Sequence, residues 1–221
     1  MTFTQRLRKK SQPIWNAQLK HPFVRALGNG SLSPKKFKFY ILQDSLFLFE
    51  LSKVFGQGAF RSPNSKLMSH FTKLQADTLE VEQALHREYG KKWKLSDTQM
   101  TSVPMAPTNY AYTRHMLQVA LTGSLIEITS VALPCAWIYC EVGLHLCRKP
   151  IPKNHPYINW LSLYSSPEFA EVAAWMRALV DRLALSVGPQ IRKKVEHDFW
   201  ISSQYELLFW QMAWNEEKWP V

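Results

Sequence analysis

The sequence has few cysteines, few glycines and no long uninterrupted apolar run. Its three cysteines, Cys135, Cys140 and Cys147, are odd in number and lie five and seven residues apart, which fits neither a disulfide framework nor a zinc site. Glu127 and Glu141 interrupt the longest apolar stretch before it reaches the roughly 18 residues of a membrane span. The N-terminal segment lacks the apolar core of a secretory signal. We therefore expect reduced thiols, no membrane partner and a cytoplasmic location.

Acidic residues are also scarce, because 17 Asp and Glu stand against 27 Lys and Arg, giving a net charge of +10. Such a balance can indicate nucleic-acid binding. The basic residues are nevertheless scattered in small clusters at expected helix ends and connections, and no recognition-helix or zinc-finger pattern accompanies them. We expect no specific nucleic-acid partner.

Helical periodicity is abundant. Apolar residues recur at intervals of three and four, and Ser-Pro, Gly and Asn signals separate the periodic stretches. The pattern predicts a single all-α domain over residues 1–221, arranged as a compact helical bundle. His21-Pro22 is expected to lie just past the end of the first helix, Gly28-Asn29-Gly30 to turn the chain, and residues 91–107 to form the longest loop. The expected helices cover residues 3–19, 33–57, 62–89 and 109–121, a segment from 124 through Cys135, a short segment around 160–164, and 165–187 and 189–215.

The pair Pro134-Cys135 lies inside the most apolar of these helices. A proline in a helix interior costs about 3 kcal/mol, since it removes a hydrogen bond and clashes with the preceding turn. The resulting kink would change the direction in which Cys135 and Tyr139, one turn apart, project. A nucleophilic thiol is one reason for such a feature, and a small packing residue is the other.

Two carboxylates lie among apolar residues, Asp44 in one helix and Glu206 in the last. A buried carboxylate needs a partner, which can be a structural salt bridge, a helix end, a metal or a ligand. The chain also has 9 Trp, 12 Phe and 8 Tyr. Together these features favour a pocket for a flat, nitrogen-containing ring, clamped by carboxylates and stacked on aromatic side chains.

A metal site is the alternative use of the carboxylates. Glu82/His86 and Glu141/His145 are pairs at i and i+4, whereas di-iron bundle proteins use Glu-x-x-His at i and i+3. A di-metal oxygenase is therefore disfavoured, and we expect no metal and no other cofactor.

Several segments resemble one family when taken in order. They are HPFVRALGNG at 21–30, FKFYILQD at 37–44, LPCAWIY at 133–139 and SQYELLFWQMA at 203–213. The chain resembles the TenA family, thiaminase II. The resemblance implies a haem oxygenase-like fold without haem, a homotetramer, and hydrolysis of 4-amino-5-aminomethyl-2-methylpyrimidine or thiamine to the hydroxymethylpyrimidine in thiamine salvage.

The resemblance also assigns roles to individual residues. Cys135 matches the nucleophile, and Asp44 matches the carboxylate that holds the exocyclic amine and the neighbouring ring nitrogen. Glu206 matches the acid/base group at the opposite ring nitrogen. Phe47 retains the ring-stacking position but lacks the hydroxyl of the tyrosine that many members carry there. Ser45 also stands at a position that is tyrosine in many members. The other ring-lining positions are Tyr112, Tyr139, Tyr164 and Phe209. A TenA-like protein that binds pyrimidine or regulates without hydrolysing is the remaining alternative.

Overall fold

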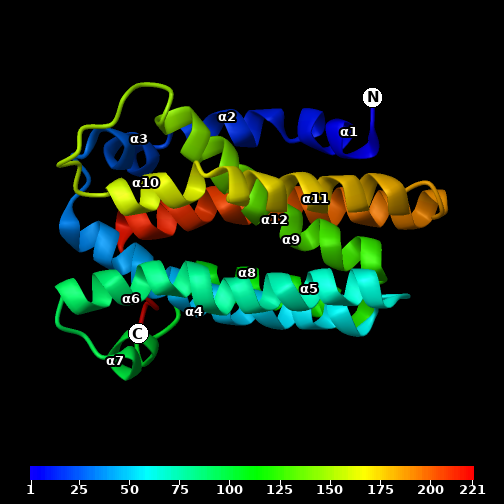
Figure 1. The fold of residues 1–221 in the computed structure, drawn as a ribbon, viewed down its shortest axis with the longest axis horizontal. Coiled ribbons are helices and arrows are strands. Elements are labelled where there is room, and N and C mark those ends of the chain that lie inside the picture. The colour runs from blue at the N-terminus through cyan, green and yellow to red at the C-terminus, as the bar shows by residue number, and fades with distance from the viewer. The chain divides into compact units, whose positions relative to one another are not determined.

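The computed structural model covers residues 1–221 and describes every side chain except those of residues 81–83 and 97. Within that description the regular structure is helical and contains no strand, as Figure 1 shows. The expected all-α class is confirmed. The chain divides into two compact units, each made of segments that are distant in the sequence.

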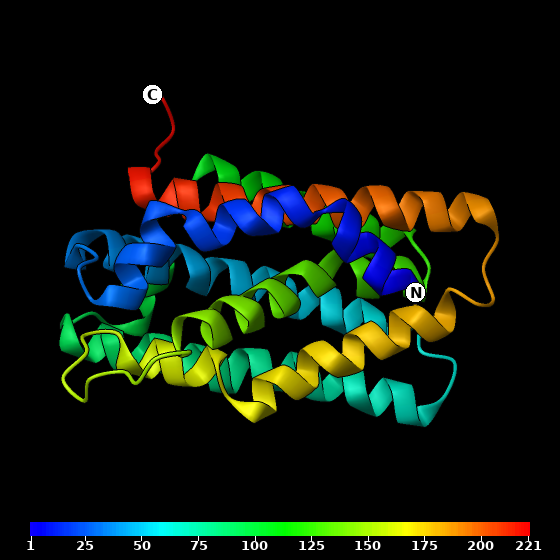
Figure 2. The ribbon, with the colours of Figure 1, turned by 90° about the horizontal axis from the view of Figure 1, so that it is seen from above.

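Unit 1 combines residues Met1–Leu32 with Thr129–Gln211. Two acidic side chains accept hydrogen bonds from helices that are far away in the sequence. Arg8 donates to both oxygens of Glu141, at 2.9 and 3.3 Å, and Thr4 donates to Asp181. Helix α1 packs on α11, α2 on α3 and α10 on α11, and Figure 2 shows these helices from a second direction. The helices are α1 (Phe3–Lys10), α2 (Gln12–Lys20), α3 (Pro22–Asn29), α10 (Ile158–Tyr164), α11 (Pro167–Leu183) and most of α9 (Leu125–Leu146) and α12 (Pro189–Asn215).

Unit 2 combines residues Ser33–Ile128 with Met212–Val221. Helix α4 is its centre, and α5, α6 and α8 all pack against it. The C-terminal segment joins the unit through the indole of Trp219, which donates to the carbonyl of Met105 at 2.9 Å. The elements are α4 (Pro34–Phe60), α5 (Ser65–Asp77), the π-helix η1 (Thr78–Glu82), α6 (Gln83–Lys92), α7 (Asp97–Thr101) and α8 (Pro107–Thr122).

Prolines and polar caps begin the helices where the sequence predicted them. Pro34, Pro167 and Pro189 are first residues of α4, α11 and α12, a position in which the missing N–H costs nothing and the fixed φ favours the helix. Ser166 caps α11 by accepting a hydrogen bond from Phe169 N–H at 3.1 Å. Such local signals explain why the starts of the long helices are predictable.

Three expectations about local structure are wrong. Residues 22–29 form a helix, α3, because His21 caps it and Gly30 ends it with φ of 79°, a left-handed conformation that glycine adopts without strain. The expected loop at 91–107 contains α7, which a capping box at Ser96 begins. The expected helix at 62–89 is interrupted by η1, a π-helical turn.

Helix α9 is apolar and almost entirely buried. Among the described residues it is the helix long and apolar enough to cross a membrane, with a mean hydropathy of 1.4 in its most apolar window, yet 94% of that window is buried inside the protein. Its side chains are thus covered by other parts of the chain, as expected for a helix that is apolar on all sides.

Candidate functional site

Helix α9 carries the predicted thiol. Pro134 lies inside the helix, which continues on both sides of it, so the predicted placement of the proline is correct. Cys135 is half-buried and Tyr139, one turn further along, is buried. The two side chains therefore share a face of α9, and Cys135 is the less buried of the two residues.

An aromatic cluster in unit 1 holds two of the predicted ring-lining residues together. The rings of Tyr139 and Tyr164 lie 5.0 Å apart between centroids. Tyr139 also stacks on Trp210 at 4.9 Å with 29° between the planes, and Trp160 contacts Tyr164 at 4.5 Å. These separations are typical of favourable aromatic pairs. The orientation of Tyr139 and Tyr164 is consequently fixed by packing on two tryptophans.

Glu206 and Phe209 lie one turn apart on α12, and each is 2% exposed. The sequence interpretation of Glu206 as a buried carboxylate is correct. Residues at i and i+3 are neighbours on a helix surface, so α12 presents an acid and an aromatic ring side by side. The carboxyl group is thus held out of bulk water, where its interactions with nearby polar groups are stronger.

In unit 2 the side chain of Asp44 is 4% exposed and has two polar neighbours. The hydroxyl of Tyr40 donates to Oδ2 at 3.3 Å, and Nε2 of His86 lies 3.0 Å from the same oxygen. Nε2 makes no hydrogen bond of good geometry, so the His86 contact is a close polar contact rather than a well-directed hydrogen bond. Asp44 is therefore buried and anchored through one oxygen.

Phe47 and Tyr112 form the second aromatic pair among the predicted residues. Their ring centroids are 5.1 Å apart with 34° between the planes, and both side chains are buried. Helices α4 and α8, which carry them, are packed against each other. Unit 2 thus brings Phe47 and Tyr112 together.

Tyr40 and His86 are the polar neighbours that sequence reasoning missed. Tyr40 lies one turn before Asp44 on the same helix, so the four-residue spacing could have predicted that the two side chains are neighbours. His86 was considered as a metal ligand with Glu82, whose side chain lies outside the described residues. Glu141 of the other candidate pair binds Arg8, and no cluster of three metal-ligating side chains occurs among the described residues.

Burial changes the proton affinity of two side chains in unit 1. It raises the pKa of the Cys140 thiol, with a smaller contribution from Glu141 and an opposing one from Arg177. It lowers the pKa of His21, against the effect of the hydrogen bond to Gln211. A raised thiol pKa reduces the thiolate fraction and hence reactivity. Cys140 therefore has the chemistry of a packing residue.

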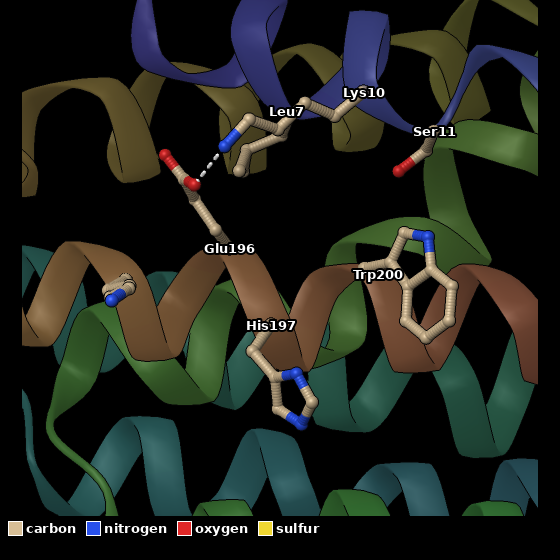
Figure 3. Close-up of a pocket in the computed structure, with 7 residues that line it drawn as sticks. Leu7, Lys10, Ser11, Glu196, His197 and Trp200 are labelled. Carbon is tan, nitrogen blue, oxygen red and sulfur yellow. Dashed lines mark hydrogen bonds and ion pairs between the residues drawn. The ribbon is translucent and has the colours of Figure 1, made fainter.

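A separate groove of about 320 Å³ lies between the N-terminal helices and α12 in unit 1. Lys10 and Glu196 form an ion pair at its rim, and Trp200 contributes an indole ring to it, as Figure 3 shows. None of the predicted site residues is among the side chains that line it, which are Leu7, Lys10, Ser11, Lys193, Glu196, His197 and Trp200.

Solved structures and a protein-family model both match this chain over most of its length. A solved TenA homologue from P. horikoshii OT3 superposes with a TM-score of 0.87, at 30% identity, and covers 97% of this chain and 99% of its own. The architecture is therefore that of TenA-type helical proteins. The chain belongs to the TENA/THI-4/PQQC family, whose model matches residues 8–216.

Two curated relatives match over nearly the whole chain. The aminopyrimidine aminohydrolase of Halalkalibacterium halodurans is 40% identical over 220 residues, which are 99% of this chain and 98% of that protein. The aminopyrimidine aminohydrolase of Helicobacter pylori is 34% identical over 216 residues, 97% of this chain and 100% of that protein. Each match therefore spans nearly the whole of both proteins.

Proposed function

We propose that this protein is an aminopyrimidine aminohydrolase, a thiaminase II that hydrolyses a C–N bond. Its substrates are 4-amino-5-aminomethyl-2-methylpyrimidine and thiamine, and its product is the hydroxymethylpyrimidine used in thiamine salvage. The observation that carries the proposal is the 40% identity over 220 residues to an aminopyrimidine aminohydrolase. Buried carboxylates, two aromatic pairs and a half-buried thiol support the same chemistry.

In unit 1 we assign the covalent step to Cys135 and the proton transfers to Glu206. A primary amine is a poor leaving group. Addition of the thiolate to a ring carbon, while the protonated carboxyl group of Glu206 gives its proton to a ring nitrogen, breaks the aromaticity. The ring electrons then expel the protonated amine as ammonia. Water adds to the exocyclic methylene and releases its proton to solvent, Glu206 takes back the ring proton, and expulsion of the thiolate restores the ring. Tyr139, Tyr164 and Phe209 line the ring.

In unit 2 we assign substrate recognition to Asp44 and ring stacking to Phe47 and Tyr112. An ionised carboxylate accepts hydrogen bonds and donates none, so Asp44 suits the exocyclic amine of an aminopyrimidine. Its burial strengthens that contact, because bulk water does not compete for the carboxylate.

The assembly, location and domain organisation complete the proposal. We propose a homotetramer in the cytoplasm, no cofactor, no membrane or specific nucleic-acid partner, and one TenA-like domain over residues 1–221. The family match across residues 8–216 supports treating both units as one functional chain.

Ammonia release from 4-amino-5-aminomethyl-2-methylpyrimidine tests the activity. Cys135→Ser should lower kcat by roughly 10³-fold, because the hydroxyl is a far weaker nucleophile. Cys147→Ser is the matched control and should retain activity, since Cys147 is half-buried like Cys135 but has no role in the proposal. Equal kcat values for the wild type and Cys135→Ser would refute the covalent mechanism.

The remaining alternatives give different results. A non-hydrolytic binding or regulatory protein would bind the pyrimidine in calorimetry without releasing ammonia, and duplex DNA binding would weaken steeply as salt is raised. A di-metal oxygenase would contain stoichiometric iron in metal analysis of the purified protein.

A further inference from the structure

His86 is a buried histidine in direct contact with Asp44. Its side chain is 1% exposed, and Nε2 lies 3.0 Å from Asp44 Oδ2. We propose that His86 is a positioning residue: with Tyr40 it holds Oδ2 of Asp44, which leaves Oδ1 to accept the 4-amino group of the substrate. The proposal rests on the proposed function, and it identifies what sets the preference for an aminopyrimidine.

The contacts of Asp44 are divided unequally between its two oxygens. Tyr40 and His86 both approach Oδ2, and among the described residues no polar contact of Asp44 ends on Oδ1. Two anchors on one oxygen fix the rotation of the carboxylate about its Cβ–Cγ bond. Oδ1 then presents its lone pairs in one direction, which is the requirement for reading a single N–H group of a ligand.

His86 lacks the features of a purely structural core histidine. Buried polar atoms are normally hydrogen-bonded, yet both ring nitrogens of His86 are buried with no hydrogen-bond partner among the residues whose side chains are described. Its polar contact in the described structure is the one with Asp44. Asp44 is therefore the polar group that the buried imidazole approaches, and no local network on α6 accounts for the histidine among the described residues.

The backbone before His86 contains a π-helical segment, which affects the direction of the His86 side chain. The π-helical segment η1 ends at residue 82, four residues before His86, and both η1 and α6 pack against α4. A π-helical turn contains one extra residue, so it rotates every later side chain relative to a regular helix, and such turns are frequent at functional sites. Tyr89, one turn after His86, packs edge-on against Phe37 of α4 at 4.9 Å, which secures this register.

Ligand discrimination tests the proposal. We would measure by calorimetry the Kd of two ligands, 4-amino-5-hydroxymethyl-2-methylpyrimidine and the analogue with hydrogen in place of the 4-amino group. The variants are His86→Leu, which fills similar space without a polar atom, and His86→Gln, whose amide can reach the same oxygen. The control is His70→Leu, at an exposed histidine of α5. The ratio of the two Kd values does not depend on the fraction of folded protein.

The preference for the amino ligand should fall about tenfold in His86→Leu, the effect of losing one oriented hydrogen bond. His86→Gln should restore it to within about twofold, and His70→Leu should leave it unchanged. In ammonia-release assays His86→Leu should raise KM more than it lowers kcat, as expected when uniform binding is lost. An unchanged preference in His86→Leu would overturn the proposal.

An Asp44→Ala background separates positioning from general loosening of the fold. If His86 acts through Asp44, His86→Leu causes no further loss of preference once Asp44 is absent. An equal loss in both backgrounds would contradict the proposal. A wild-type protein that neither binds nor hydrolyses aminopyrimidines would refute the proposed function itself, whereas an active wild type with an unaffected His86→Leu would refute the role of His86 alone.

Discussion

The close approach of α9 to the end of α10 makes Gly143→Ala a sharp test of the packing in unit 1. A Cβ at Gly143 would lie 2.8 Å from the backbone N of Ser165 and closer still to the carbonyl carbon and oxygen of Tyr164, whereas ordinary contacts begin at 3.4 Å. These are backbone atoms, so no side chain can rotate away. Relief requires a shift of α10 or α9 by more than about 0.6 Å, into an interior that is already close-packed.

The change in the free energy of unfolding caused by Gly143→Ala follows from two opposing effects. Overpacking costs about 3 kcal/mol, the upper part of the usual range, because rigid backbone lies opposite the added methyl. Replacing glycine in a helix interior returns roughly 0.5–1 kcal/mol. The net loss of about 2 kcal/mol corresponds to a decrease of roughly 4–8 °C in the unfolding midpoint for a chain of this size.

Thermal unfolding followed by circular dichroism measures this change. Gly56→Ala is the control, since Gly56 also lies within a long helix but faces the flexible end of the Gln75 side chain, and its midpoint should stay constant or rise by a few degrees. Displacement of Tyr164 should also lower kcat/KM, by up to about 10²-fold. A Gly143→Ala midpoint equal to or above that of the wild type would refute the packing argument.

Three further substitutions or reactions test individual side chains. Phe47→Tyr supplies the hydroxyl that distinguishes many TenA members from this chain, and we expect kcat to rise several-fold; a lower kcat would contradict a role for that hydroxyl in acid–base chemistry. Burial lowers the pKa of His21 below its ordinary 6.5, and its Nδ1 accepts from Phe23 N–H only while the ring is neutral. The unfolded chain therefore binds the proton first, and stability present above pH 6.5 is lost as the pH falls through the folded-state pKa. His21→Asn keeps a capping oxygen and should flatten the decrease in unfolding midpoint between about pH 7.5 and 5.5. Because burial raises the pKa of Cys140, iodoacetamide should label it more slowly than Cys147, as peptide mass spectrometry would show; faster labelling of Cys140 would exclude this explanation.

The sequence could predict the helical class and the burial of key polar groups. Periodicity and proline-linked starts are local signals, and Asp44 and Glu206 are buried at 3% and 2% exposure as expected. The TenA resemblance is likewise confirmed by the family match. The assigned roles of Cys135 and the ring-lining residues stay predictions.

The remaining features depend on contacts that no local pattern encodes. Helix α3 was missed because its cap is His21, a residue with a weak capping preference, whose ring accepts from Phe23 N–H. The contact between His86 and Asp44 depends on the rotation that η1 introduces. A regular helix projected from the sequence gives His86 a different direction, so this contact could not be predicted.

The order of segments in the two units has a consequence for biosynthesis. Unit 1 needs residues 1–32 and residues up to 211, and unit 2 needs residues from 33 and the segment 212–221. Neither unit is complete until nearly the whole chain has left the ribosome, so N-terminal helices must wait for partners synthesised much later. No single cut in the gene yields an intact unit. We therefore expect nascent chains to depend on protection from aggregation until translation ends.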